Sequence, residues 1–133
     1  MNDMEINTHQ MINRKLCGNP TNVGDGFAHV EMAATEAMTA DATGLVHGGF
    51  IFGMADYAAM LAVNDPNVVL GAAEVTFLKP VAVQETVVAE ARVSDIKGKK
   101  QTVQVVVQRG NETVFKGNFT CFVLEKHVRS KQG

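Results

Sequence analysis

An almost uninterrupted run of apolar residues extends from Gly48 to Val63, and Asp56 is its only formal charge. The run is rich in Ala, Met and Leu, whose spacing and intrinsic preference predict a helix. At about 1.5 Å per residue, this helix would be roughly 24 Å long. A helix that is apolar on all sides is normally buried, and this one is too short and too interrupted to span a membrane. We therefore expect a buried central helix that ends near Asn64.

The segments on both sides of this helix alternate between apolar and polar residues, which is typical of half-buried β-strands. Before the helix, Phe27–Met38 is expected to form one strand, with its even-numbered apolar residues facing the core. The strands expected after the helix are one that starts near Val69 and closes at Lys79-Pro80, then Glu85–Ile96, Gln101–Arg109 and Thr113–Leu124. Short turn-like connections between the last three predict antiparallel hairpins.

The remaining segments carry weaker patterns. Glu5–Leu16 mixes polar and apolar residues and is expected to form a short helix. In Cys17–Gly26 the density of Gly and Pro predicts turns, and Thr39–Val46 is expected to be a loop. The polar tail His127–Gly133 is expected to fray.

This order of elements predicts a single domain over residues 1–133 with an α+β fold, in which an antiparallel sheet wraps the central helix. The 133-residue chain is long enough to bury one real core. Val88 and Val106 would lie on the other face of the sheet, which would then need cover. An oligomer could provide that cover.

Composition narrows the classes of function. Hydrophobic residues make up 46% of the chain, charged residues 20%, and the net charge is −2, so nothing in the charge balance favours a nucleic-acid partner. Asp3, Glu5 and Asn7 occupy the region where a signal peptide would be basic and then apolar. The two cysteines form no spaced motif. We therefore expect a protein of the reducing cytoplasm without a membrane or nucleic-acid partner.

Two motifs accompany the central helix. His47-Gly48-Gly49 stands directly at its start, with Asp56 nine residues after the histidine, and the stretch Val75–Val81 contains Phe-Leu-Lys-Pro. Over residues 24–124, this order and these motifs resemble the hotdog-fold acyl-CoA thioesterases, most closely the PaaI-like branch. The resemblance implies a hotdog fold, a homodimer or dimer of dimers, and acyl-CoA held at the subunit interface. Coenzyme A would then be part of the substrate, and no separate cofactor is expected.

Asp56 is the first candidate catalytic residue. Aspartate is a poor former of helix interiors and more often caps helix ends. Burying its carboxylate costs several kcal/mol unless the group is paired or neutralised. Desolvation near a substrate would raise the pKa of Asp56 towards that of a useful base. We therefore interpret Asp56 as a general base or nucleophile, although a purely structural hydrogen-bonding role is the alternative.

Gly48 and Gly49 lie where the first N–H groups of the helix lack internal partners. A thioester carbonyl placed there would meet a donor for its developing negative charge, as an oxyanion hole requires. A tight turn would explain the two glycines nearly as well. In the resembling family the first glycine is the donor, which corresponds to Gly48 here. His47 could orient the loop, bind the substrate carbonyl or contact an interface group.

Asp41 and Lys79 are the candidate substrate-binding residues, together with Gly49. Asp41 lies six residues before His47, where the PaaI-like branch commonly has Asn. An ionised Asp cannot donate a hydrogen bond, so it could be a second carboxylate, a residue that structures the loop, or a sign of weakened catalysis. Lys79 could contact coenzyme A phosphates, whereas the lysines of the turn Lys97–Lys100 are expected to be solvated.

Other chemistries have less support. The histidines lack metal-ligand spacing, and Ser94 and Ser130 are poorly placed for a Ser-His-Asp hydrolase. A non-catalytic acyl-CoA-binding module remains an alternative, because some hotdog domains sense acyl-CoA. A hotdog dehydratase is a weaker option, since the central helix carries no histidine.

The two polar features of the helix, the Gly48 entrance and Asp56, are eight residues apart in the sequence. Gly48 and Asp56 would be about 12 Å apart along the axis. They cannot easily meet within one helix. We expect the Gly48 entrance of one subunit to face Asp56 of another.

Overall fold

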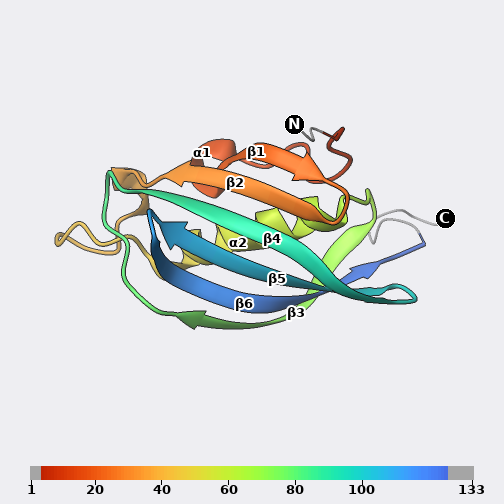
Figure 1. Cartoon of the computed structure of the whole chain (residues 1–133). Helices are drawn as coiled ribbons and strands as arrows, with labels where there is room; N and C mark the ends of the chain where they lie inside the picture. The colour runs from red at the N-terminus through yellow and green to blue at the C-terminus, as the bar shows by residue number, and fades with distance from the viewer. Residues whose placement is uncertain (1–3, 126–133) are drawn as a thin grey trace.

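The computed structural model describes residues 4–125, in which one six-stranded antiparallel sheet curves around helix α2 (Gly48–Val63) (Figure 1). The strands are β1 (Asn19–Gly24), β2 (Phe27–Ala33), β3 (Val68–Phe77), β4 (Thr86–Lys97), β5 (Lys100–Arg109) and β6 (Glu112–Val123). They lie in the order β1-β2-β4-β5-β6-β3, so β1 and β3 are the two edges. This arrangement confirms the predicted α+β hotdog fold.

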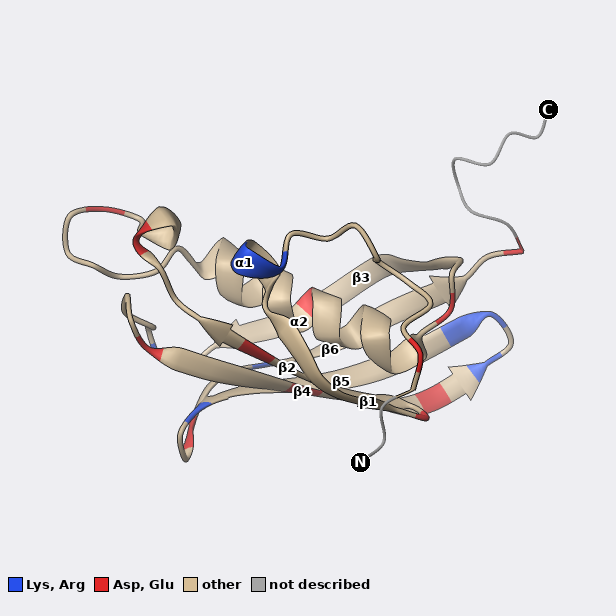
Figure 2. Ribbon diagram, turned by 90° about the horizontal axis from the view of Figure 1, so that it is seen from above, with Lys and Arg blue, Asp and Glu red and all other residues tan. Residues whose placement is uncertain are grey.

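Helix α2 forms where the apolar run predicts it. His47 caps its start, and Asn64 ends it in the left-handed conformation with φ of 54°. The helix buries Ala55, Ala58 and Ala59, whose small side chains let strands β2, β4 and β5 approach closely. Viewed from above, α2 lies on one side of the sheet. The short helix α1 (Arg14–Cys17) packs against α2 on the side that faces away from the sheet (Figure 2).

The strands after α2 match their predictions within two residues at each end. β4 pairs with β5 and β5 with β6 as antiparallel hairpins, as the short turns predict. β3 follows α2 in the chain but pairs with β6. In β2 the expected inward residues are buried, but the strand ends at Ala33 and a 3-10 turn, η1 (Glu36–Met38), replaces its predicted end.

The prediction of a helix over residues 5–16 is wrong. Only Arg14–Cys17 is helical, because the Asn13 side chain accepts hydrogen bonds from the N–H groups of Lys15 and Leu16 and so starts the helix there. The preceding residues instead cross the end of α2. There the Asn64 amide accepts from Asn7 N–H and donates to Glu5 O, both at 2.8 Å. The predicted frayed tail, 127–133, lies outside the described residues.

The prediction of turns over Cys17–Gly26 missed strand β1. β1 pairs antiparallel with β2 across a turn at Asp25-Gly26. Pro20 is tolerated because β1 is an edge strand, where a missing N–H interrupts no second ladder.

The face of the sheet opposite α2 is more polar than Val88 and Val106 suggested. Val106 lies between Glu90 and Lys116 on the neighbouring strands, and both valines are half-buried. Polar neighbours therefore limit the apolar surface that an oligomer would have to cover. Among the described residues, none of the helices is long and apolar enough to cross a membrane.

Candidate active site

The entrance of α2 is organised by His47. Its Nδ1 accepts a hydrogen bond from Gly49 N–H at 2.9 Å. A neutral imidazole that accepts through Nδ1 carries its proton on Nε2, so Nε2–H is left as a donor. A side chain on residue 49 would lie 2.8 Å from that Nδ1, which explains why glycine fits there. The Gly49 N–H thus donates its hydrogen bond to a side chain of the protein itself.

Gly48 lies in the wall of a cavity of about 340 Å³ at the same end of α2. The cavity is lined by Val46, Gly48, Ile51, Phe77, Leu78, Lys79, Pro80, Val81 and Val114. Within residues 4–125, no group accepts a hydrogen bond from Gly48 N–H. This donor, at the positive end of the helix, therefore lies in the wall of a largely apolar cavity.

Lys79 lines the same cavity, so the structure brings two of the predicted site residues together. The Lys79 ammonium lies 3.0 Å from a carboxylate oxygen of Glu112, and both side chains are about half exposed. Two large apolar residues of the cavity wall, Phe77 and Leu78, are exposed. Leu45, which pairs with Ala82, is exposed as well. The cavity thus combines an apolar rim with one cation and one backbone donor.

Asp56 is held in the middle of α2, away from that cavity. Its Oδ1 is buried and has no hydrogen-bond partner among the described residues. Burial raises the pKa of Asp56 to about 6. Burial and, secondly, the nearby Asp56 charge raise the pKa of Cys17 and raise that of Cys121 to about 12.

The structure does not bring Asp56 and Gly48 together within one chain. Eight residues of helix separate them, about 12 Å along the axis, and Asp56 is not part of the cavity wall. Their joint participation in one site remains a prediction that requires a second copy of the chain.

Asp41 lies in the loop between η1 and α2, which projects from one end of the molecule (Figure 1). Its carboxylate accepts hydrogen bonds from Thr43 Oγ1 at 2.6 Å and Thr43 N–H at 2.9 Å. These two bonds lower the pKa of Asp41. Of the three roles considered for Asp41, structuring the loop is the one that these contacts display.

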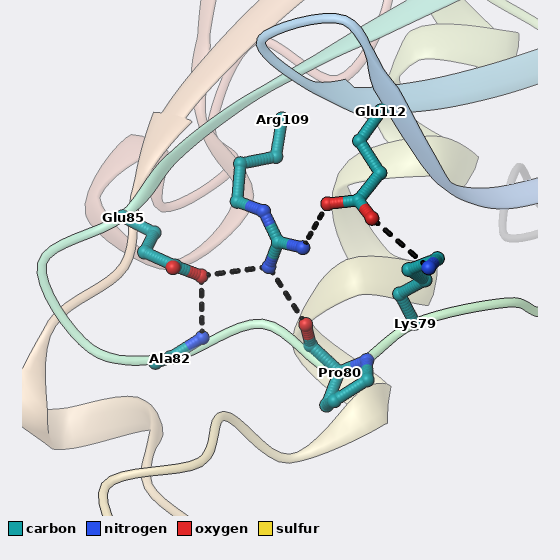
Figure 3. A network of polar contacts seen from close by, with 6 residues as sticks. All are labelled: Lys79, Pro80, Ala82, Glu85, Arg109 and Glu112. Atoms are coloured by element: carbon teal, nitrogen blue, oxygen red, sulfur yellow. Dashed lines mark hydrogen bonds and ion pairs between the residues drawn. The ribbon is translucent and has the colours of Figure 1, made fainter.

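Two features near the site were missed by the sequence reasoning. A network of charged residues joins Arg109, Glu85, Glu112 and Lys79 beside the cavity (Figure 3). Arg109 and Glu85 are 24 residues apart, so no local pattern could indicate their pairing. The buried Tyr57 hydroxyl, next to Asp56 in α2, has no hydrogen-bond partner in the described part of the chain.

Metal ligands do not converge in the described part of the chain. Over residues 4–125, no three His, Cys, Asp or Glu side chains lie close enough to hold a metal ion. The chemistry available here is that of a carboxyl group, a backbone donor and an apolar cavity.

Comparison with solved structures supports the fold over the whole chain. An uncharacterised protein from Pyrococcus horikoshii is 52% identical with a TM-score of 0.95, and the match covers 98% of this chain and 100% of that one. The Escherichia coli PaaI protein from the phenylacetic acid degradation operon is 25% identical with a TM-score of 0.72, over 78% of this chain and 81% of that one.

Curated relatives are longer proteins. Methylthioribose-1-phosphate isomerase of Aquifex aeolicus is 51% identical over 130 residues, which is 97% of this chain but 28% of that protein. The transcription factor FapR of Caldanaerobacter subterraneus is 31% identical over 98 residues, 74% of this chain and 49% of FapR. The chain thus spans less than half of each of these two relatives.

The family assignment rests on the sequence as well as the fold. Residues 43–116, which include the α2 entrance, Asp56 and Lys79, match the thioesterase superfamily. The PaaI protein shares the arrangement of a long helix wrapped by an antiparallel sheet. The chain therefore belongs to the thioesterase superfamily, and its hotdog fold is consistent with the PaaI-like branch.

Proposed function

We propose that the protein is an acyl-CoA thioesterase whose site forms between two subunits. The observation that carries this proposal is the half-buried Asp56 carboxyl group in an apolar helix: its Oδ1 is buried without a partner in the described residues, and burial raises its pKa to about 6. Such a group is mostly ionised at neutral pH and retains enough basicity to accept a proton from water. Membership of the thioesterase superfamily and the apolar cavity beside Gly48 support the same chemistry.

In the proposed reaction, Asp56 accepts a proton from a water molecule as the water oxygen attacks the thioester carbonyl carbon. The negative charge that develops on the carbonyl oxygen is stabilised by Gly48 N–H of the other subunit. Collapse of the tetrahedral intermediate breaks the carbon–sulfur bond, and the coenzyme A thiolate takes up the proton. Direct attack by the Asp56 carboxylate is the alternative route. The Nε2–H of His47 would help to place the carbonyl.

A homodimer, or a dimer of dimers, follows from this assignment. α2 holds Gly48 and Asp56 too far apart to act on one carbonyl in a single chain. β3 is an edge strand, and its residues 71–74 are exposed and mostly small. A second copy that pairs there would bring two α2 helices near each other. We place this assembly in the cytoplasm, with acyl-CoA as its ligand and no further cofactor.

The test compares the wild type and Asp56→Asn on a panel of short, long and aryl acyl-CoAs. Hydrolysis is measured as the release of the coenzyme A thiol. We expect the variant to lose at least 100-fold in kcat, because a positioned base typically contributes 10² or more. Asp95→Asn, an exposed strand carboxylate, is the matched control and should behave as the wild type. Equal turnover by the wild type and Asp56→Asn would reject Asp56 as the base.

A second candidate function is acyl-CoA sensing without hydrolysis. The similarity to FapR, a transcription factor, favours it. The same assay separates the two functions. Stoichiometric binding of an acyl-CoA by the wild type, with no thiol released over hours, would support a sensor and contradict the thioesterase.

A further inference from the structure

One part of the wall of the Gly48 cavity, Leu78 to Val81, comes from a segment outside the sheet. β3 ends at Phe77 and β4 begins only at Thr86. Leu78 and Lys79 still donate their N–H groups to Val114 O, at 2.8 and 3.2 Å. Pro80 has no N–H to donate, so regular pairing cannot continue through it. The part of this segment that lines the cavity therefore needs another tether.

Arg109, at the end of β5, supplies that tether (Figure 3). Its Nη1 donates to Pro80 O at 2.8 Å and to Glu85 Oε1 at 2.9 Å, and its Nη2 donates to Glu112 at 2.5 Å. The Glu85 carboxylate also accepts from Ala82 N–H at 2.9 Å. One guanidinium thus fixes both ends of the segment 80–85 against the β5–β6 turn.

The same segment is bonded on its other side to the loop that leads into α2. Val46 N–H donates to Val81 O at 2.8 Å, and Val83 N–H donates to Gly44 O at 2.9 Å. His47 and Gly48 follow directly. The cavity wall therefore lies between Arg109 and the loop that sets the position of the Gly48 donor.

We propose that Arg109 is a positioning residue that holds the 80–85 segment, and with it the wall of the cavity, in the geometry that receives the acyl-CoA. The identity of that ligand rests on the proposed function. The contacts argue for a positioning role: the partly exposed side chains of Arg109, Glu85 and Glu112 are joined to one another and to Pro80 O at a single place beside the cavity. The planar guanidinium with its five N–H groups suits three acceptors better than a lysine ammonium does.

The direct test is amide hydrogen exchange on the full chain, for the wild type, Arg109→Gln and Arg109→Lys. We expect exchange at Val46 and Val83 to quicken about 10-fold in Arg109→Gln, because a lost charged hydrogen bond is worth about a factor of ten or more. The amide of Val93, which donates to Gly26 O at 2.8 Å, should not change. Arg109→Lys should fall between the wild type and Arg109→Gln. Unchanged exchange at Val46 and Val83, or equal acceleration at Val93, would overturn the proposal.

Acyl-CoA kinetics give the second readout. We expect Arg109→Gln to raise KM about 10-fold while kcat stays within about 2-fold, because the reacting groups remain and only the receiving geometry loosens. Arg92→Gln, which removes an exposed guanidinium from β4, is the matched control and should change neither constant. A fall in kcat at constant KM would contradict a positioning role.

Failure of the proposed function is distinguishable from failure of this inference. A wild type that binds but does not hydrolyse acyl-CoA would remove the thioesterase assignment. The exchange measurement, and the dissociation constant of a non-hydrolysable CoA thioether, would still decide whether Arg109 positions the cavity wall.

Discussion

At the scale of single residues, Asp56 shows how a group suited to chemistry weakens the fold that holds it. Its pKa rises from an ordinary 3.8 to about 6 because burial disfavours the charged form. A folded-state pKa above the unfolded value favours folding below about pH 4. That contribution is lost as the pH rises from about 4 through 6. At 1.36 kcal/mol per pKa unit, the loss is about 3 kcal/mol.

Asp56→Asn should therefore be more stable than the wild type at pH 8, by up to about 3 kcal/mol, because the amide carries no charge to desolvate. The difference should shrink towards zero near pH 4. Urea unfolding at a series of pH values measures both free energies of unfolding. A difference that is the same at pH 4 and pH 8 would show that the variant acts through packing and not through the carboxylate charge.

The setting of Asp56 inside an apolar helix could be predicted from the sequence because it is local, whereas its catalytic role stays a prediction. A single charge inside an apolar helix is visible in the order of residues, and so is a Gly-Gly entrance. The Arg109 network could not be predicted from the sequence, because its members are far apart along the chain. Its members come from two connections of the sheet, β3–β4 with Lys79 and Glu85 and β5–β6 with Arg109 and Glu112. Only the pairing of β4 with β5 and of β3 with β6 brings these connections to one end of the molecule.

At the scale of elements, the N-terminal segment is bonded to the end of α2 through Asn64. Asn64 adopts the left-handed conformation that stops the helix, and its amide bonds the backbone of Glu5 and Asn7. Residues 5–13 are thus placed by contacts with distant parts of the chain, including the packing of Ile6 and Ile12 against the core. This explains why their local pattern failed to predict their structure, while the helix at 48–63 was predicted.

Asn64→Ala should lower the free energy of unfolding by about 1–3 kcal/mol, from left-handed backbone strain and two lost hydrogen bonds. Asn64→Gly is the matched control, because glycine accepts φ of 54° and loses only the hydrogen bonds. We expect Asn64→Gly to lie between the wild type and Asn64→Ala in urea unfolding. Wild-type stability in both variants would mean that the segment is held by its other contacts.

At the scale of the whole molecule, the two edges of the sheet are unequal. β1 is short and polar and contains Pro20, which protects an edge from pairing. β3 is longer and exposes Gly71, Ala72 and Ala73. An unprotected edge of small residues is a template for a second strand. Because of this asymmetry, we propose β3 as the edge where a second copy pairs.

Ala73→Lys should shift the protein from dimer towards monomer and reduce thiol release with it, because an edge lysine opposes strand pairing between copies. Asn19→Lys, on β1, is the matched control and should keep the wild-type mass. Sedimentation equilibrium across a range of concentrations measures both. A monomeric wild type with full activity would contradict a shared site, and so would an Ala73→Lys dimer of unchanged affinity.

The order of strands also dictates when the chain can finish folding during synthesis. β3 is made directly after α2, yet its partner β6 is the last strand of the sheet to leave the ribosome. Phe119 of β6, whose ring centroid lies 5.4 Å from that of Phe52, covers one side of α2. Until β6 emerges, a nascent chain displays a hydrophobic helix and an unpaired strand together, the two surfaces that chaperones and aggregates bind. Helix α2, which carries the proposed catalytic carboxylate, is thus also an apolar surface that the nascent chain exposes until β6 has been made.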